Sequence, residues 1–302
     1  MSTLLRTPLL RSTTLGDAFG GTALLKAELF QKTGSFKPRG ILAKLATLTP
    51  EERACGVITV SAGNAAAAVA FGCALEKIDC LVLMWQGTSE VKAAAAKAYG
   101  AAVDREAPGP GEAFARLEAL RAETGRVFVH PFDDPVVIEG HSSLSREILE
   151  DAPETDVIVA GVGGGGLISG VALGAPEARV VGVEPEGSTA LRDGLAAGHP
   201  VLVQPNSIAD ALNAPIAGEH CLAVCRERGV ESVLVAEDDI RAGFRFLYER
   251  AKLAAEPGAA AGVGALLAGK VPDVEGKTVA VVVSGGNVAG KTAAAILSSN
   301  EA

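Results

Sequence analysis

Short apolar runs alternate with helical segments along most of the 302-residue chain, and this alternation most constrains the fold. Seven runs have the length of strands: Val57–Val60, Asp79–Met84, Ala101–Asp104, Val127–His130, Asp156–Ala160, Arg179–Glu184 and Lys277–Val283. Helices are predicted between them, over Ala65–Glu76, Ser89–Tyr99, Gly111–Thr124, Ser188–Ala197 and Asp238–Lys252. A strand followed by a long helix is typical of parallel βαβ units. The chain is therefore predicted to be an α/β protein with two open parallel sheets.

Composition narrows the class of protein further. The net charge of −9 argues against general binding to nucleic acid, which needs basic side chains to neutralise phosphates. No apolar run approaches the 18 residues of a membrane span, and the start of the chain has no signal-peptide pattern. Five cysteines at no metal-binding spacing are expected to be buried small side chains in a reducing compartment. These features predict a cytoplasmic protein.

A run of four glycines, Gly163–Gly166, follows one predicted strand and opens a helix. Bare backbone N–H groups at a helix N-terminus bind anions, so a phosphate is the expected ligand. The spacing of Gly161, Gly163 and Gly166 also matches a dinucleotide-binding fingerprint, and Glu184 ends the next strand where a ribose-binding acid would lie. This loop alone leaves a nicotinamide-dependent dehydrogenase open as an alternative.

A lysine lies in an unusual position in the segment Lys32–Gly40. Pro38 suits the first position of a helix that runs to about Leu48, which places Lys37 at the helix N-terminus. The positive end of the helix dipole disfavours an ammonium group there. A lysine that is partly neutral can attack a carbonyl carbon and form a Schiff base.

The segment Gly34–Gly40 resembles the lysine motif of the fold-type II pyridoxal-phosphate enzymes, in the serine/threonine dehydratase and serine racemase branch. Further motifs follow in the family's order over nearly the whole chain: Ser61–Asn64, Gly163–Leu167, Glu184–Pro185, Ile208–Asp210, Glu256–Pro257 and Ser284–Asn287. The resemblance implies a tryptophan-synthase-beta-like architecture. A small domain at 55–132 is expected to be inserted into a large cofactor-binding domain at 1–54 and 133–302, with the active site between them.

The resemblance also implies roles for individual residues. Lys37 would bind pyridoxal 5'-phosphate as a Schiff base and move the substrate's Cα proton. The residues expected to contact the cofactor are Lys37, Phe36, Asn64, Gly163, Gly164, Gly165, Gly166, Leu167 and Ser284. Those expected to bind the substrate, through its carboxylate, are Ser61, Ala62, Gly63, Asn64 and Ala65. For Ser284 and Asn64, a helix-capping role is the alternative.

A cation site is implied at Glu184 and Ser188. Relatives that favour divalent ions carry a second acid at the position of Ala190 in this chain. A single carboxylate with backbone carbonyls suits a monovalent ion or a weak divalent site.

The reaction implied is β-elimination from L-serine or L-threonine, because Ser284 would place a neutral hydroxyl at the pyridine nitrogen. Ala62 replaces the serine that racemases use as a second acid/base, so little racemisation is expected. Serine racemase and a β-replacement synthase remain alternatives within the family, and a non-catalytic cofactor-binding protein is the alternative outside it. The family resemblance favours a homodimer acting on a small amino acid, while the net charge and the short apolar runs predict no nucleic-acid or membrane partner.

Overall fold

The computed structural model describes residues 4–88 and 90–299, and these fold into two compact units. The larger unit contains the described residues up to Phe36 and from His141 onward, and the smaller unit contains Lys37–Gly140. Ser89, the predicted first residue of a helix, lies outside the described residues.

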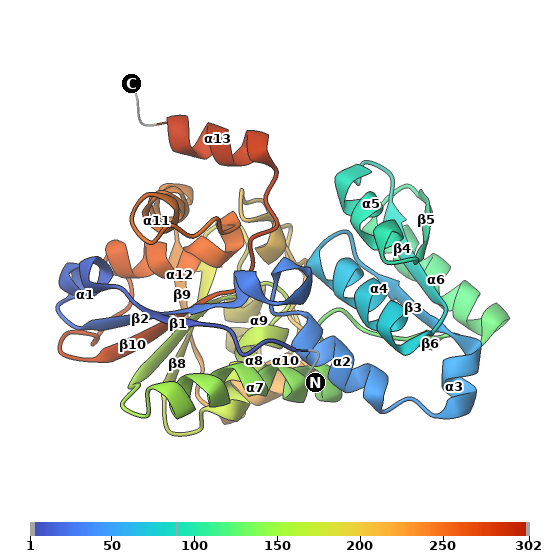
Figure 1. Cartoon of the computed structure of the whole chain (residues 1–302), viewed down its shortest axis with the longest axis horizontal. Helices are drawn as coiled ribbons and strands as arrows, with labels where there is room; N and C mark the ends of the chain where they lie inside the picture. The colour runs from blue at the N-terminus through green and yellow to red at the C-terminus, as the bar shows by residue number, and fades with distance from the viewer. Residues whose placement is uncertain (1–3, 89, 300–302) are drawn as a thin grey trace. The chain divides into compact units, whose positions relative to one another are not determined.

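The larger unit is built on a six-stranded sheet in the order β1-β2-β10-β7-β8-β9 (Figure 1). Its strands are β1 (Leu9–Arg11), β2 (Thr22–Ala27), β7 (Val157–Gly161), β8 (Arg179–Pro185), β9 (Glu231–Val235) and β10 (Thr278–Val283). All pairs are parallel except β1 with β2, which is antiparallel at the edge of the sheet. The sequence predicts the parallel sheet but not this antiparallel edge.

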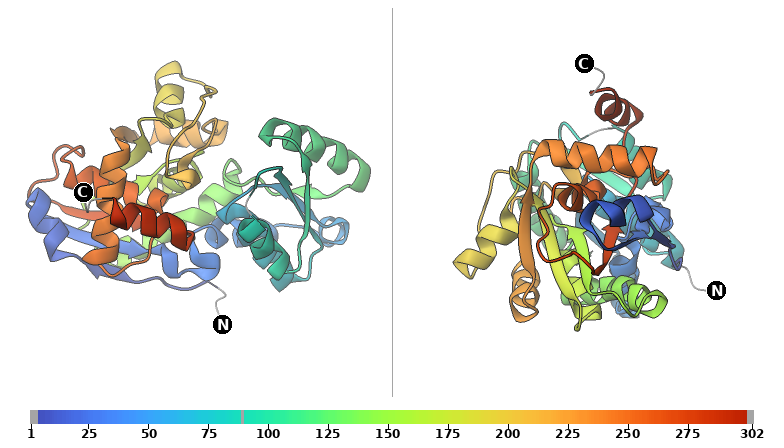
Figure 2. Two further views of the ribbon diagram at one scale, coloured as in Figure 1. Left: turned by 90° about the horizontal axis from the view of Figure 1, so that it is seen from above. Right: turned by 90° about the vertical axis from the view of Figure 1, so that its left-hand side faces the viewer.

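Helices cover both faces of this sheet (Figure 2). Helices α1 (Thr13–Phe19), α11 (Glu237–Glu249), α12 (Pro257–Leu267) and α13 (Gly290–Ser298) supply apolar side chains to the core on one face. Helices α7 (Pro135–Asp151), α8 (Gly166–Gly174), α9 (Ala190–Ala197) and α10 (Glu219–Glu227) supply those on the other face. Three short 3-10 helices, η1 (Glu28–Phe30), η2 (Lys32–Gly34) and η3 (Asp210–Leu212), lie in the connections.

Alternation along the central strands explains the two cores. In β10, Val279, Val281 and Val283 pack into the first core, while Ala280 and Val282 pack into the second. Successive side chains of a strand point to opposite faces, so a strand covered on both sides reads as a continuous apolar run.

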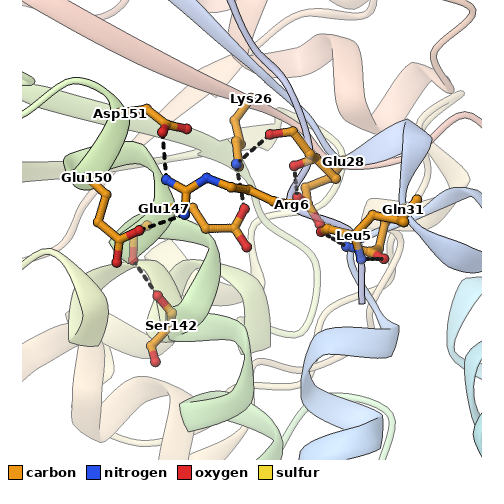
Figure 3. Close-up of polar contacts among 11 residues, drawn as sticks. Leu5, Arg6, Lys26, Glu28, Gln31, Ser142, Glu147, Glu150 and Asp151 are labelled. Carbon is orange, nitrogen blue, oxygen red and sulfur yellow. Dashed lines mark hydrogen bonds and ion pairs between the residues drawn. The ribbon is translucent and has the colours of Figure 1, made fainter. Parts of the chain in front are cut away.

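A buried charge ties the start of the chain to this unit (Figure 3). Lys26 of β2 is fully buried, and its ammonium donates hydrogen bonds to the Thr7 carbonyl at 2.8 Å and the Glu147 carboxylate of α7 at 2.6 Å. The Gln31 side chain pairs with both the N–H and the C=O of Leu5, at 2.9 and 2.7 Å. Breaking either contact would leave buried polar groups unpaired, so residues 5–7 are held beside β2 and Gln31.

The smaller unit has a four-stranded parallel sheet in the order β5-β4-β3-β6. Its strands are β3 (Val57–Val60), β4 (Cys80–Trp85), β5 (Ala102–Ala107) and β6 (Val127–Phe128). Its helices are α2 (Pro38–Ala46), α3 (Pro50–Cys55), α4 (Asn64–Glu76), α5 (Glu90–Ala98), α6 (Pro110–Thr124) and the first turns of α7. Two cores flank the sheet, one with side chains of α2, α4 and α5 and the other with those of α6.

This unit is wider than the insert that the sequence predicts at 55–132. It also includes residues 37–54 and 133–140, because Ile41 and Leu45 of α2 pack into the same core as β3 and α4. The boundaries of the functional domains stay a prediction.

The cysteines differ from expectation at one position. Cys73, Cys80, Cys221 and Cys225 are buried, as predicted, whereas Cys55 is exposed because it ends the short surface helix α3. No helix among the described residues is long and apolar enough to cross a membrane.

Candidate active site

The glycine loop, defined as Gly163–Leu167, joins β7 to α8 in the larger unit. Gly165 is the N-cap residue, with a φ of 95°, and α8 begins at Gly166. The N–H groups of the five loop residues donate no hydrogen bond to any other described residue. The first N–H groups of a helix lack an intrahelical partner and carry its positive dipole end. The loop therefore offers a set of donors to an anion.

Two glycines of this loop leave little room for a side chain. A Cβ atom on Gly165 would lie 2.7 Å from the Cβ of Cys221, and one on Gly163 would lie 3.1 Å from the Ala211 carbonyl oxygen. The backbone at Gly165 also has a positive φ that other residues rarely adopt. Bare amides packed this closely suit a phosphate group such as that of pyridoxal phosphate.

Ser284 follows β10 and is 6% exposed. Its hydroxyl makes no hydrogen bond within the described part of the chain, so it can bond a bound molecule. Helix α13 has Ala289 as its N-cap residue, which argues against the capping alternative for Ser284.

The segment before the lysine is paired with this serine turn. The Phe36 N–H donates to the Ser284 carbonyl at 3.0 Å, and the Gly286 N–H donates to the Gly34 carbonyl at 2.9 Å. Ser35 and Gly285 form the antiparallel bridge between these two bonds. The larger unit thus brings together two motifs that are about 250 residues apart in the sequence.

Phe36 lies in the core of the larger unit. It is 8% exposed and packs edge-on against His141, with ring centroids 4.8 Å apart. These contacts fix the Phe36 ring, while its role beside the cofactor stays a prediction.

Lys37 is the N-cap residue of α2 in the smaller unit, and Pro38 occupies the first turn, as the sequence predicts. Its Nζ atom donates a hydrogen bond to the Pro131 carbonyl at 2.7 Å. Sequence reasoning missed the loop that carries this acceptor, the segment from His130 to Asp134 between β6 and α7. The feature that could have indicated this loop is its place directly after a strand, since the carboxyl ends of parallel strands carry functional loops.

The Ser61–Ala65 turn joins β3 to α4 in the same unit. Gly63 is the N-cap residue and Asn64 the first helical residue, so the capping alternative for Asn64 is not the one seen. The Ser61 hydroxyl accepts a hydrogen bond from the Gly63 N–H at 3.2 Å. A Cβ atom on Gly63 would meet nothing within 4 Å, so this turn, unlike the glycine loop, has open space beside it.

Glu184 is fully buried and caps α9. Its carboxylate accepts hydrogen bonds from the N–H groups of Leu191 and Arg192, at 2.7 and 2.9 Å, and from the Ser232 hydroxyl at 2.6 Å. Burial raises the pKa of this carboxyl, and the three hydrogen bonds oppose that rise.

The contacts of these residues do not favour a cation site. The Ser188 hydroxyl donates to the Leu212 carbonyl at 2.8 Å, so this oxygen too has a protein partner. Across residues 4–88 and 90–299, no three His, Cys, Asp or Glu side chains are grouped to hold a metal ion. The cation at Glu184 and Ser188 stays a prediction.

Comparison with known proteins decides the family. The family model described as pyridoxal-phosphate dependent enzyme matches residues 2–285. The chain belongs to this family. The dinucleotide alternative for the glycine loop is therefore set aside, and the predicted cofactor is confirmed.

Individual relatives agree with this family. The chain is 40% identical to an L-threonine ammonia-lyase of Thermotoga maritima over 288 residues, which cover 94% of the chain and 71% of the relative. It is 37% identical to a phenylserine dehydratase of Ralstonia pickettii, covering 93% and 87% of the two chains. The structure of maize serine racemase superposes with a TM-score of 0.91 at 34% identity, covering 96% and 90%. The predicted fold class and the predicted branch of the family are confirmed.

Proposed function

We propose that this pyridoxal-phosphate dependent enzyme is an L-serine/L-threonine ammonia-lyase, which converts its substrate to a 2-oxo acid and ammonia. The observation that carries the proposal is Ser284, a buried neutral hydroxyl at the end of β10. A hydroxyl at the pyridine nitrogen does not enforce its protonation, which favours prompt elimination over chemistry that needs a long-lived carbanion. The 40% identity to an L-threonine ammonia-lyase supports the same activity.

The proposed cofactor roles are those that the family resemblance implies for each residue. In the larger unit, the N–H groups of the glycine loop hold the phosphate and Ser284 faces the pyridine nitrogen. In the smaller unit, Lys37 binds the cofactor covalently, Asn64 bonds its 3′ oxygen and the amides of the Ser61–Ala65 turn bind the substrate carboxylate. When bound, pyridoxal phosphate supplies an electron sink for the bond broken at Cα.

Lys37 supplies the base for the elimination. Its side chain reaches the Pro131 carbonyl at 2.7 Å, so the amine has an acceptor that fixes its direction when it is free. The amine takes the Cα proton, the β-hydroxyl leaves with a proton as water, and the resulting enamine adds water to give the 2-oxo acid and ammonia. Overall, L-threonine gives 2-oxobutyrate and ammonia, and L-serine gives pyruvate and ammonia.

Ala62 favours elimination over racemisation. Racemisation requires an acid/base on the face of Cα opposite the lysine, and the Ala62 methyl group carries no exchangeable proton. The similarity to maize serine racemase keeps racemisation as the second candidate function.

An assay of the purified holoenzyme tests the proposal. We expect 2-oxo acid and ammonia in equal amounts from L-threonine and L-serine, and less product from O-acetyl and β-chloro amino acids. Lys37→Ala should lower turnover by about 1000-fold or more. Borohydride reduction of the wild-type holoenzyme should attach the cofactor stably to Lys37, and this label should be absent from Lys37→Ala. Thiol-dependent replacement without 2-oxo acid would show a synthase, and D-serine as the main product would show a racemase.

The cellular setting belongs to the same proposal. We expect a homodimer in the cytoplasm with no nucleic-acid partner, in line with the family resemblance and the net charge of −9. Sedimentation equilibrium of the holoenzyme tests the dimer.

A further inference from the structure

The loop beside Lys37 is shaped by a histidine ring. His130 Nδ1 accepts hydrogen bonds from the backbone N–H groups of Asp133, at 2.7 Å, and Phe132, at 3.2 Å. Pro131 lies between His130 and these two residues in the sequence, and its carbonyl accepts a hydrogen bond from the Lys37 Nζ atom. All of these residues belong to the smaller unit.

The two amides determine the protonation of the ring. An N–H group can only donate, so the Nδ1 atom that receives both bonds carries no proton. His130 is therefore neutral with its proton on Nε2. It performs the task that an Asn or Asp side chain performs in an Asx turn, where a side-chain acceptor closes the backbone two and three residues ahead.

Helix α2 is held to the same loop at a second point. Asp134 accepts hydrogen bonds from the N–H groups of Val136 and Val137, at 2.8 and 3.2 Å, and pairs with Lys44 of α2 at 2.7 Å. Lys37 and Lys44 lie near opposite ends of α2, so the helix and the loop cannot shift independently without breaking one of these contacts.

We propose that His130 is a positioning residue for Lys37, a role that rests on the proposed function of this lysine. The neutral ring closes the turn that directs the Pro131 carbonyl at the lysine amine. Without the Nδ1 acceptor, two amides lose their partner, the turn opens, and the amine loses its orientation toward an incoming carbonyl carbon. Misplacing a reacting group by about 1 Å lowers rates by about 100-fold.

Packing of the ring is the competing explanation. His130 lies edge-on between Phe128 and Phe132, with centroid distances of 5.3 and 4.6 Å. Two substitutions separate the acceptor from the ring. His130→Phe keeps an aromatic ring and removes the acceptor, whereas His130→Asn keeps an acceptor at Asx-turn distance and removes the ring.

The experiment measures how fast each apoprotein captures added pyridoxal phosphate, followed by the Schiff-base absorbance, together with thermal stability. We expect His130→Phe to slow capture and turnover by about 10- to 100-fold, and His130→Asn to recover most of that loss. Phe128→Leu is the matched control, since it removes a ring neighbour and leaves Nδ1 untouched. Wild-type rates in His130→Phe, or equal loss in both His130 variants at unchanged stability, would overturn the proposal.

A measurement on the unmodified protein serves if a variant does not fold. The chain has four histidines, so imidazole 15N spectra of the apoprotein are simple enough to assign. We expect the His130 ring, assigned through its couplings to the backbone, to have an unprotonated Nδ1 and a proton on Nε2 near neutral pH. A proton on Nδ1 of His130 would contradict the inference. Failure of the proposed function gives a different result. The wild-type protein would then produce no 2-oxo acid, or Lys37→Ala would still form the Schiff base with the cofactor.

Discussion

The glycine loop and the Ser61–Ala65 turn have the same place in their units but leave different amounts of space. Each follows a buried parallel strand and opens a helix, so each presents backbone N–H groups to an anion. In the glycine loop, added Cβ atoms at Gly163 and Gly165 would press on neighbouring atoms. In the Ser61–Ala65 turn, an added Cβ at Gly63 would meet nothing within 4 Å.

This difference matches the two tasks proposed for these segments. A phosphate is the same in every catalytic cycle, so a loop proposed to hold it can be tightly packed. Substrates differ in their side chains and must enter and leave, so a turn proposed to bind them needs room. We therefore expect changes at Gly163 and Gly165 to affect folding and cofactor affinity together, and changes at Ala62 and Gly63 of the other turn to affect the reaction alone.

Of the variants that test this comparison, Gly165→Ala is expected to have the largest effect. The new methyl group would lie 2.7 Å from Cys221 Cβ on a backbone with a φ of 95°, which should destabilise the protein by about 3 kcal/mol. Cofactor affinity should fall by about 100-fold, because the loop amides are displaced. Calorimetry and cofactor titration measure both quantities.

Gly63→Ala is the matched control for that variant. Its φ of −146° is not in the left-handed region, unlike that of Gly165, and the space beside it is open. Unfolding temperature and cofactor affinity should stay at wild-type values, with any change confined to the substrate KM. A control as unstable as Gly165→Ala would remove the distinction between the two loops.

A smaller effect is expected from Ser284→Ala. The methyl group fits the same space, so the protein should fold and keep its cofactor spectrum, while kcat falls by about 10- to 100-fold through loss of one hydrogen bond to the cofactor. If Ser284→Ala is purified without bound cofactor under conditions that retain it in the wild type, Ser284 acts in cofactor binding and not in the reaction.

The smallest effect is expected from Ala62→Ser. A hydroxyl in the open turn should leave 2-oxo acid formation within about threefold and add D-serine formation at about a tenth of that rate. Chiral analysis of serine recovered from partial turnover measures this. If no D-serine appears, the position after Ser61 does not decide between racemisation and elimination in this chain.

Much of the sheet structure could be predicted from the sequence, since strands such as Val279–Val283 are continuous runs of apolar residues. Strand β2 was not predicted, because Lys26 interrupts its apolar pattern and is tolerated only through its bonds to Thr7 and Glu147. Helix α12 was missed for the opposite reason. It is buried on all sides, so no polar face reveals a helical period.

The candidate site shows the same division. Lys37 and the glycine loop could be placed because their local turns require particular residues. The hydrogen bond from Lys37 to Pro131 joins residues 94 apart, and His130 acts through the backbone of its neighbours. Such contacts leave no periodic mark in a single sequence, and only the folded chain reveals them.

The position of β10 in the larger unit has a consequence for synthesis of the protein. This strand follows the other five strands of its sheet in the sequence, yet it lies between β2 and β7. Until Thr278–Val283 leaves the ribosome, β2 and β7 have exposed edges, and the partner of the Gly34–Phe36 segment does not exist. The smaller unit, in contrast, has all of its strands once residue 128 has emerged. A nascent chain can thus complete the strands of one unit long before those of the other, which must wait for Thr278–Val283.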